Sequence, residues 1–168
     1  MAGSIWDRIT GVLLQEFSDV QDVEGLTRTT LRLLLAAVLG GLLGLQREHA
    51  GKAAGLRTHM LIAMGSALFL LVPLQAGFDE EALSRFGQGM IAGVGLLCAG
   101  TIIKSGDVTD VRGLTTAAGM WLTSAVGMSA AMGRETTAIL SALLAFAILS
   151  VEGPLKRLLK LDRQNDSS

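Results

Sequence analysis

Residues 33–60 constrain the fold more than any other stretch of this chain. Two apolar runs flank a short loop, whose ionisable residues are Arg47, Glu48, His49, Lys52 and Arg57. Lys and Arg beside membrane spans accumulate on the cytoplasmic side. The stretch therefore predicts two transmembrane helices that are joined in the cytoplasm.

Three further apolar runs follow, so we expect an all-α polytopic membrane protein with five transmembrane helices. The predicted spans cover residues 29–46, 58–77, 86–103, 113–133 and 136–151. A span needs about 20 residues to cross the hydrocarbon. The first span reaches that length only if Arg28 and Arg32 extend from its outer end toward water.

The overall composition agrees with a membrane protein. Half of the residues are hydrophobic and 17% are charged, below the roughly 25% of soluble chains. The alternative is a soluble all-α protein. Five successive charge-poor runs disfavour it, because they leave no amphipathic helix to face water.

The chain divides into three regions. Residues 1–27 form an acidic segment with helical periodicity, which fits either a helix in the membrane interface or a helix packed on the bundle. Residues 28–153 form the five-helix transmembrane domain. Residues 154–168 begin as a basic amphipathic tail, which suits an anionic membrane surface.

The sorted charges predict the orientation in the membrane. Of the 14 Lys and Arg residues, nine lie after the first, third and fifth spans and five lie on the opposite face. This bias places the N-terminus outside and the C-terminus in the cytoplasm of a bacterial inner membrane.

A weaker copy of the first helix pair recurs later in the chain. Residues 39–44 followed by 55–58 resemble residues 94–100 followed by 113–116. The similarity predicts two parallel helix-pair repeats plus a closing helix. The alternative is chance similarity among helices rich in Gly and Leu.

Small residues predict the faces through which the helices pack. Gly40 and Gly44 form one GxxxG pair, and Gly89 and Gly93 form another. Such pairs let backbones approach closely. We expect these glycines to support helix packing and a homodimer.

The sharpest polar feature lies where the second and fourth spans begin. Helix N-termini attract anions, and a nearby arginine strengthens that attraction. If the two repeats are adjacent, a pocket for a phosphate-type ligand, a lipid headgroup or a partner's acidic residue forms there. Its expected residues are Arg47, Glu48, Arg57, Thr58, Asp110, Arg112, Thr115 and Thr116. The alternative is that these residues are topology anchors and helix N-caps.

Catalysis and cofactor binding are not indicated. We expect no enzymatic activity, no cofactor and no nucleic-acid partner, because catalytic and phosphate-loop motifs are absent and the net charge is −1. The polar residues at depth, Ser66, Gln88, Thr101, Thr123 and Ser124, are expected to support packing. His49 and His59 are expected at the cytoplasmic border, and Cys98 as a small buried side chain.

Four motifs in order resemble the MgtC/SapB family of bacterial inner-membrane proteins. They are GGLLGLQRE, GKAAGLRTHMLIAMGSALFLL, IAGVGLLCAGTIIKSG and VRGLTTAAGMWLTSAVGM, which together cover about residues 31–133. Little sequence follows Lys160, so the chain is expected to be similar to the short, SapB-like branch. Two positions depart from the family pattern: Gln46 replaces an acidic residue, and Cys98 replaces a glycine.

The resemblance implies a regulatory role in magnesium homeostasis, acid stress or life inside host cells. Family members act on other membrane proteins such as the F-type ATP synthase. The alternative function is a small transporter or channel for Mg²⁺ or another ion. An enzyme acting on a lipid or isoprenoid phosphate is a third class, disfavoured because the sequence shows no general base.

Overall fold

The computed structural model describes residues 4–16, 23–104 and 111–151. The predicted basic tail at 154–168 therefore lies outside the described residues. The chain divides into two compact units, Met1–Leu31 and Arg32–Ser168. Each unit is considered by itself.

The first unit contains α1 (Ile5–Glu16) and the start of α2 (Val23–His49). The backbone N–H of Ser4 donates to a carboxylate oxygen of Asp7 at 2.9 Å, which stabilises the first turn of α1. All residues of α1 are exposed, including Trp6 and Ile9. The helical periodicity of the N-terminal segment is confirmed over these residues, and its place in the membrane interface stays a prediction.

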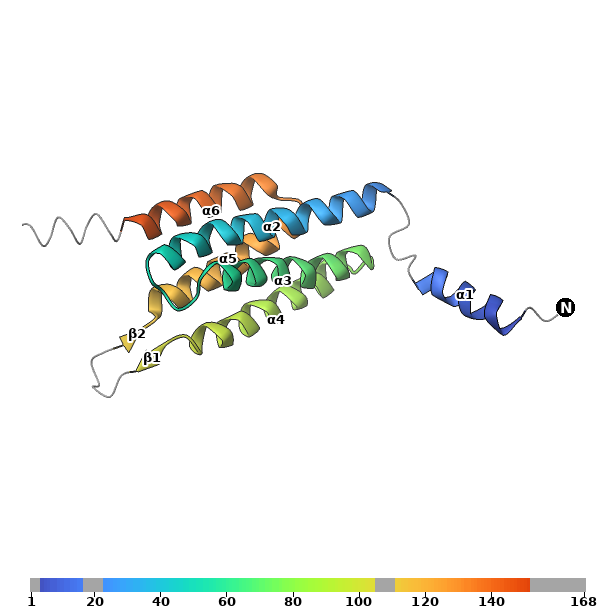
Figure 1. Ribbon diagram of the computed structural model, residues 1–168, viewed down its shortest axis with the longest axis horizontal. Helices are drawn as coiled ribbons and strands as arrows, with labels where there is room; N and C mark the ends of the chain where they lie inside the picture. The colour runs from blue at the N-terminus through green and yellow to red at the C-terminus, as the bar shows by residue number, and fades with distance from the viewer. Residues whose placement is uncertain (1–3, 17–22, 105–110, 152–168) are drawn as a thin grey trace, which may run out of the picture. The chain divides into compact units, whose positions relative to one another are not determined.

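The second unit is a bundle of long helices (Figure 1). After α2 come α3 (Leu56–Gln75), α4 (Glu80–Ala99), α5 (Leu114–Ala131) and α6 (Glu135–Ser150). Each predicted span falls on one of these helices, with the ends shifted by a few residues. The loop expected between α4 and α5 instead contains a small antiparallel hairpin of β1 (Ile103–Lys104) and β2 (Val111–Arg112), which pairs Ile103 with Arg112.

Among the described residues, three helices are long and apolar enough to span a membrane, namely α2, α3 and α4. The prediction of five spans is therefore supported only in part. The helix α6 has 16 residues, fewer than the roughly 20 that a span needs. The helix α5 carries Thr, Ser and Gly residues that lower its hydropathy, and ten of its residues are buried against the other helices.

The bundle is built around α3 and α5. The helix α5 packs against α3, α4 and α6, and α6 and α4 lie at opposite margins of the bundle in Figure 1. A Cβ added to Gly127 of α5 would lie 2.8 Å from the backbone carbon of Ala63 in α3. The two backbones therefore touch at this point, as small residues in membrane helices allow.

The helix α2 packs on α3 through its own glycines. A Cβ at Gly40 would lie 2.6 Å from the carbonyl oxygen of His59, and one at Gly44 would lie 2.7 Å from Cα of Leu56. Both positions require glycine, because any larger residue would push the helices apart. The predicted packing role of this pair is thus seen within one chain.

The bundle has two distinct ends. The α2–α3 connection and the β1–β2 hairpin lie at one end, named here the Arg47 end, and the α3–α4 connection lies at the other (Figure 1). Gly113 starts α5 with a φ of 94°, a left-handed conformation that suits glycine. Both connections that were expected to face the cytoplasm therefore share one end, while the repeat relationship itself stays a prediction.

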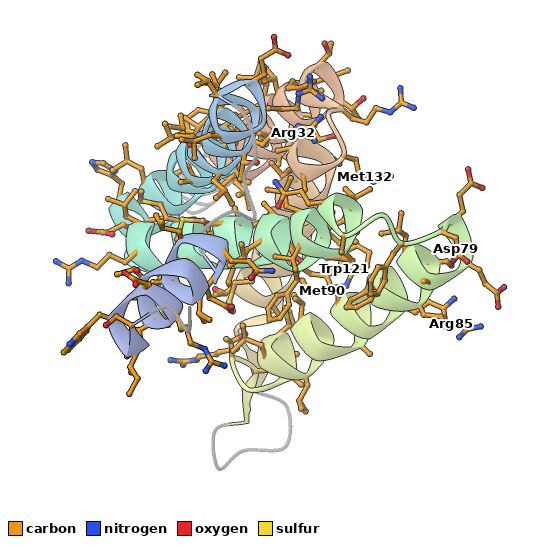
Figure 2. The ribbon with its side chains drawn as sticks, turned by 90° about the vertical axis from the view of Figure 1, so that its right-hand side faces the viewer. Arg32, Asp79, Arg85, Met90, Trp121 and Met132 are labelled. Atoms are coloured by element: carbon orange, nitrogen blue, oxygen red, sulfur yellow. The ribbon has the colours of Figure 1, made fainter. Side chains whose placement is uncertain are left out.

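At the opposite end, named the Arg32 end, an arginine of α2 contacts α5. The guanidinium of Arg32 donates to the carbonyl of Ala131 at 3.0 Å and lies 3.9 Å from the carboxylate of Glu135. A cation is favourable at the C-terminus of a helix. Arg32 therefore packs on the bundle instead of extending toward water, and Figure 2 shows the helices from this end.

The backbone contact at Gly127 generates a stability prediction. We expect Gly127→Ala to lower the free energy of unfolding by about 1–3 kcal/mol, because the new methyl group would overlap the backbone of Ala63. SDS titration of the protein in mixed micelles measures this change. The matched control is Gly95→Ala on α4, where a Cβ has nothing within 4 Å; equal losses in both variants would contradict the prediction.

Candidate functional site

Arg47 joins α2 to α5 at one end of the bundle. It belongs to the last turn of α2, is 1% exposed, and donates from its guanidinium to the hydroxyl of Thr116 at 3.3 Å. Thr116 lies in the first turn of α5. A buried guanidinium is costly without hydrogen bonds, so this contact positions both helices.

His59 lies in the same region and is fully buried in α3. Its Nδ1 is 3.0 Å from the carbonyl oxygen of Gly55, so Nδ1 carries the proton that this hydrogen bond needs. Its Nε2 is buried without a hydrogen-bond partner and would lie 3.7 Å from a Cβ added at Gly119. His59 is therefore buried within the bundle, in the first turn of α3, and its place at the cytoplasmic border stays a prediction.

Two serines extend this polar region toward the middle of the bundle. The hydroxyls of Ser66 in α3 and Ser124 in α5 are 2.7 Å apart, and both residues are buried. The hydroxyl of Thr123 donates to the carbonyl of Gly119 at 2.8 Å. In the part of the chain that the structure describes, six polar residues are buried, and we refer to them as the polar core: Arg47, His59, Ser66, Thr116, Thr123 and Ser124.

Glu48 caps the following helix. Its carboxylate accepts a hydrogen bond from the backbone N–H of Leu56 at 2.8 Å. Gly55, the residue before α3, has no side chain that could provide this cap. The geometry thus agrees with the N-cap alternative for Glu48.

The remaining residues of the predicted pocket do not all converge on Arg47. Arg57 is exposed and Thr58 is half-buried, and both line one end of a groove between α3 and α4. Arg112 and Thr115 are exposed. Asp110 lies outside the described residues. Of the predicted set, Arg47 and Thr116 are joined by a hydrogen bond, and ligand binding by the set stays a prediction.

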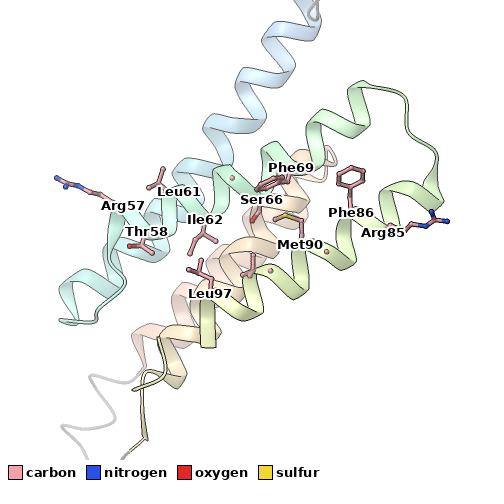
Figure 3. A pocket seen from close by; sticks show the side chains of 14 residues that line it. Arg57, Thr58, Leu61, Ile62, Ser66, Phe69, Arg85, Phe86, Met90 and Leu97 are labelled. Atoms are coloured by element: carbon pink, nitrogen blue, oxygen red, sulfur yellow. The ribbon is translucent and has the colours of Figure 1, made fainter. Parts of the chain in front are cut away.

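The groove lies between α3 and α4 and has a volume of about 950 Å³ (Figure 3). Its lining is almost entirely apolar, with charged side chains only at its ends. Arg57 and Thr58 lie at one end, and Arg85 lies at the other. The helix α4 forms the outer wall and packs loosely, because only 6% of its apolar stretch is buried, against 39% for α3.

The second glycine pair, Gly89 and Gly93, lines this groove. A Cβ at either position would have nothing within 4 Å. Unlike Gly40 and Gly44, these glycines are not used for packing within the chain, and the expected homodimer stays a prediction. Cys98, by contrast, is buried at 6% exposure, as predicted.

Sequence reasoning missed the roles of His59 and Gln46. His59 precedes Ala63 by four residues and Ser66 by seven, a spacing that places all three on one helix face. This spacing was the feature of the sequence that predicts burial of His59. The side-chain amide of Gln46 donates to the carbonyl of Leu149 at 2.8 Å, near the end of α6. A carboxylate at this position would have no proton to donate there.

The Arg47 contact predicts a specific loss of stability. We expect Arg47→Met to lower the free energy of unfolding by about 1–3 kcal/mol, since it leaves the buried Thr116 hydroxyl without its donor. SDS titration measures the change. Arg28→Met is the matched control, because Arg28 belongs to the same helix and is exposed; an unchanged midpoint for Arg47→Met would contradict the prediction.

Comparison with known proteins identifies related sequences. Protein SrpB of Synechococcus elongatus is 42% identical over 143 residues, which cover 79% of this chain and 77% of SrpB. The Escherichia coli K12 protein named "Putative magnesium transporter YhiD" is 39% identical, over 72% of this chain and 59% of YhiD. Protein MgtC of Salmonella typhimurium LT2 is 37% identical, over 65% of this chain and 46% of MgtC.

The matched part is about half of MgtC and somewhat more of YhiD. No solved structure matches the chain. The MgtC family matches residues 33–158, which include all five bundle helices except the start of α2. The four motifs, the apolar helices and this match agree, and the chain belongs to the MgtC family of membrane proteins.

Proposed function

We propose that this chain is a regulatory membrane protein of magnesium homeostasis, which acts by contacting other membrane proteins. It has neither enzymatic activity nor a cofactor in this proposal. Membership of the MgtC family and the name of the relative YhiD support the connection with magnesium. In this proposal all five bundle helices cross the bacterial inner membrane, with the N-terminus outside.

The observation that carries the regulatory role is the burial of Arg47. If an ion crossed between the helices, its path would pass the Arg47 end of α2, α3 and α5. A fixed guanidinium there repels a divalent cation, as arginines do in channels that exclude cations. Magnesium is also bound through oxygen ligands in octahedral geometry, whereas Arg47 and His59 present nitrogen atoms.

The packing of α3 and α5 adds to this argument. Their backbones touch at Ala63 and Gly127, so no ion fits between these two helices at that level. The serine hydroxyls nearby are bonded to each other at 2.7 Å. These contacts favour a closed bundle that presents its outer surface to partners.

The partner in this proposal is another membrane protein, such as the F-type ATP synthase that the family resemblance suggests. Exposed apolar residues on several helices, including Val38, Leu96 and Leu140, provide surface for helix–helix contact. By modulating a partner of this kind, the protein would support adaptation to low magnesium, acid stress or life inside host cells.

A flux assay tests regulation against transport. We expect proteoliposomes loaded with a magnesium-sensitive dye to take up Mg²⁺ no faster than vesicles without protein, because Arg47 and the closed helix contacts oppose cation entry. Saturable uptake above that background would overturn the proposal in favour of the alternative, a small magnesium transporter or channel.

A second measurement tests the regulatory role directly. Expression of the protein at limiting magnesium should improve growth of a bacterial host that lacks its own family member. Arg47→Met should abolish this effect at equal membrane levels, whereas Arg28→Met should retain it. Equal growth with and without the wild-type protein would contradict the role in magnesium homeostasis.

A further inference from the structure

We propose that the groove between α3 and α4 binds one anionic phospholipid, with its phosphate at Arg57 and Thr58 and an acyl chain along the apolar lining. This proposal depends on the membrane placement of α3 and α4, but not on whether the protein regulates or transports. It concerns a site separate from the polar core, because none of the six polar-core residues except Ser66 lines the groove.

The dimensions of the groove suit a lipid chain. It has a volume of about 950 Å³ and is lined by side chains such as Leu61, Ile62 and Phe69 of α3 and Met90 and Leu97 of α4. From Arg57 to Phe69, α3 rises about 18 Å at 1.5 Å per residue. This length is close to one leaflet, which is half of the roughly 30 Å hydrocarbon thickness.

The charges at the two ends of the groove differ. Arg85 forms an ion pair with Glu81, one turn earlier on α4, and is therefore neutralised. Arg57 has no ion pair within the described part of the chain, and Thr58, the next residue in the sequence, also lines this end of the groove. Glu48, which caps this turn, is bonded to the N–H of Leu56.

An uncompensated cation thus lies at the Arg57 end of the groove. Figure 3 shows the Arg57 side chain extending from the start of α3, while Ile62 and Met90 lie farther along the groove. Because no Asp or Glu lines the groove, an anionic group meets no repulsion from its walls. Charge at one end and apolar surface beyond it match a phospholipid headgroup and its chain.

A second copy of the chain fits this groove less well. A two-fold dimer requires a self-complementary surface, and two facing concave grooves would leave unfilled space between them. A two-fold axis along the membrane normal would also bring the groove ends of both copies to the same level. Arg57 of each copy would then meet no acidic lining residue of the other.

Native mass spectrometry of the full chain tests the proposal. Protein released from nanodiscs containing equal amounts of phosphatidylglycerol and phosphatidylethanolamine should retain one phosphatidylglycerol molecule in preference to the neutral lipid. Arg57→Gln should reduce the retained phosphatidylglycerol about fivefold, the effect of one cation near a lipid phosphate. Arg28→Gln, which removes an exposed arginine of α2, should leave it unchanged.

Filling the groove provides a second, independent test with a matched control. Gly93 and Gly95 both lie on α4 with nothing within 4 Å of an added Cβ, but only Gly93 lines the groove. Gly93→Leu should abolish retention of both lipids, and Gly95→Leu should preserve it. The SDS unfolding midpoint of each variant verifies that it folds.

Three outcomes would overturn the proposal. Equal retention of the two lipids would remove the headgroup specificity, and lipid retention unaffected by Gly93→Leu would place the lipid elsewhere. A lipid-free dimer that dissociates in Gly93→Leu would assign the groove to a second copy. None of these outcomes alters the result of the magnesium flux assay, so the two proposals fail separately.

Discussion

The fold depends on backbone contact between helices, which glycine permits. Lipid chains are as apolar as leucine, so membrane helices associate through close packing and a few hydrogen bonds. In this chain Gly40 and Gly44 bring α2 onto α3, and Gly127 brings α5 onto Ala63 of α3. The helix α3 therefore contacts both neighbours at distances that any larger residue would increase.

The polar core follows from that tight packing. Once α2, α3 and α5 pack together, Ser66 of α3 reaches Ser124 of α5, and Arg47 of α2 reaches Thr116 of α5. Hydrogen bonds of this kind contribute only about 0.6 kcal/mol each on average in membrane bundles. Their larger effect is to fix which faces meet, and they place a positive charge at one end of the helix contact. In the function proposed above, this arrangement provides a stable surface for partners and disfavours a cation path.

The side of the bundle formed by α4 is loosely packed. Its glycines at 89 and 93 meet no other element, and the helix leaves a large apolar groove against α3. Glycines thus allow α2 and α5 to pack closely on α3, whereas the glycines of α4 leave a groove between α3 and α4. The difference lies in the neighbours, because a glycine creates contact only where another backbone is present to fill the space. The open side is where the chain can exchange contacts with the membrane around it.

The sequence by itself determined the helices. Charge-poor apolar runs bounded by polar loops predicted all five bundle helices to within six residues at each end, because the hydrocarbon length and the cost of buried charge act on each segment separately. It also showed that Arg47 and Thr116 lie near helix ends that could meet. Only the tertiary structure decided which neighbours met. It buried His59, left Arg57 exposed at one end of the α3–α4 groove, and used one glycine pair but not the other. These outcomes depend on the rotation and contacts of whole helices, which a local pattern of residues does not specify.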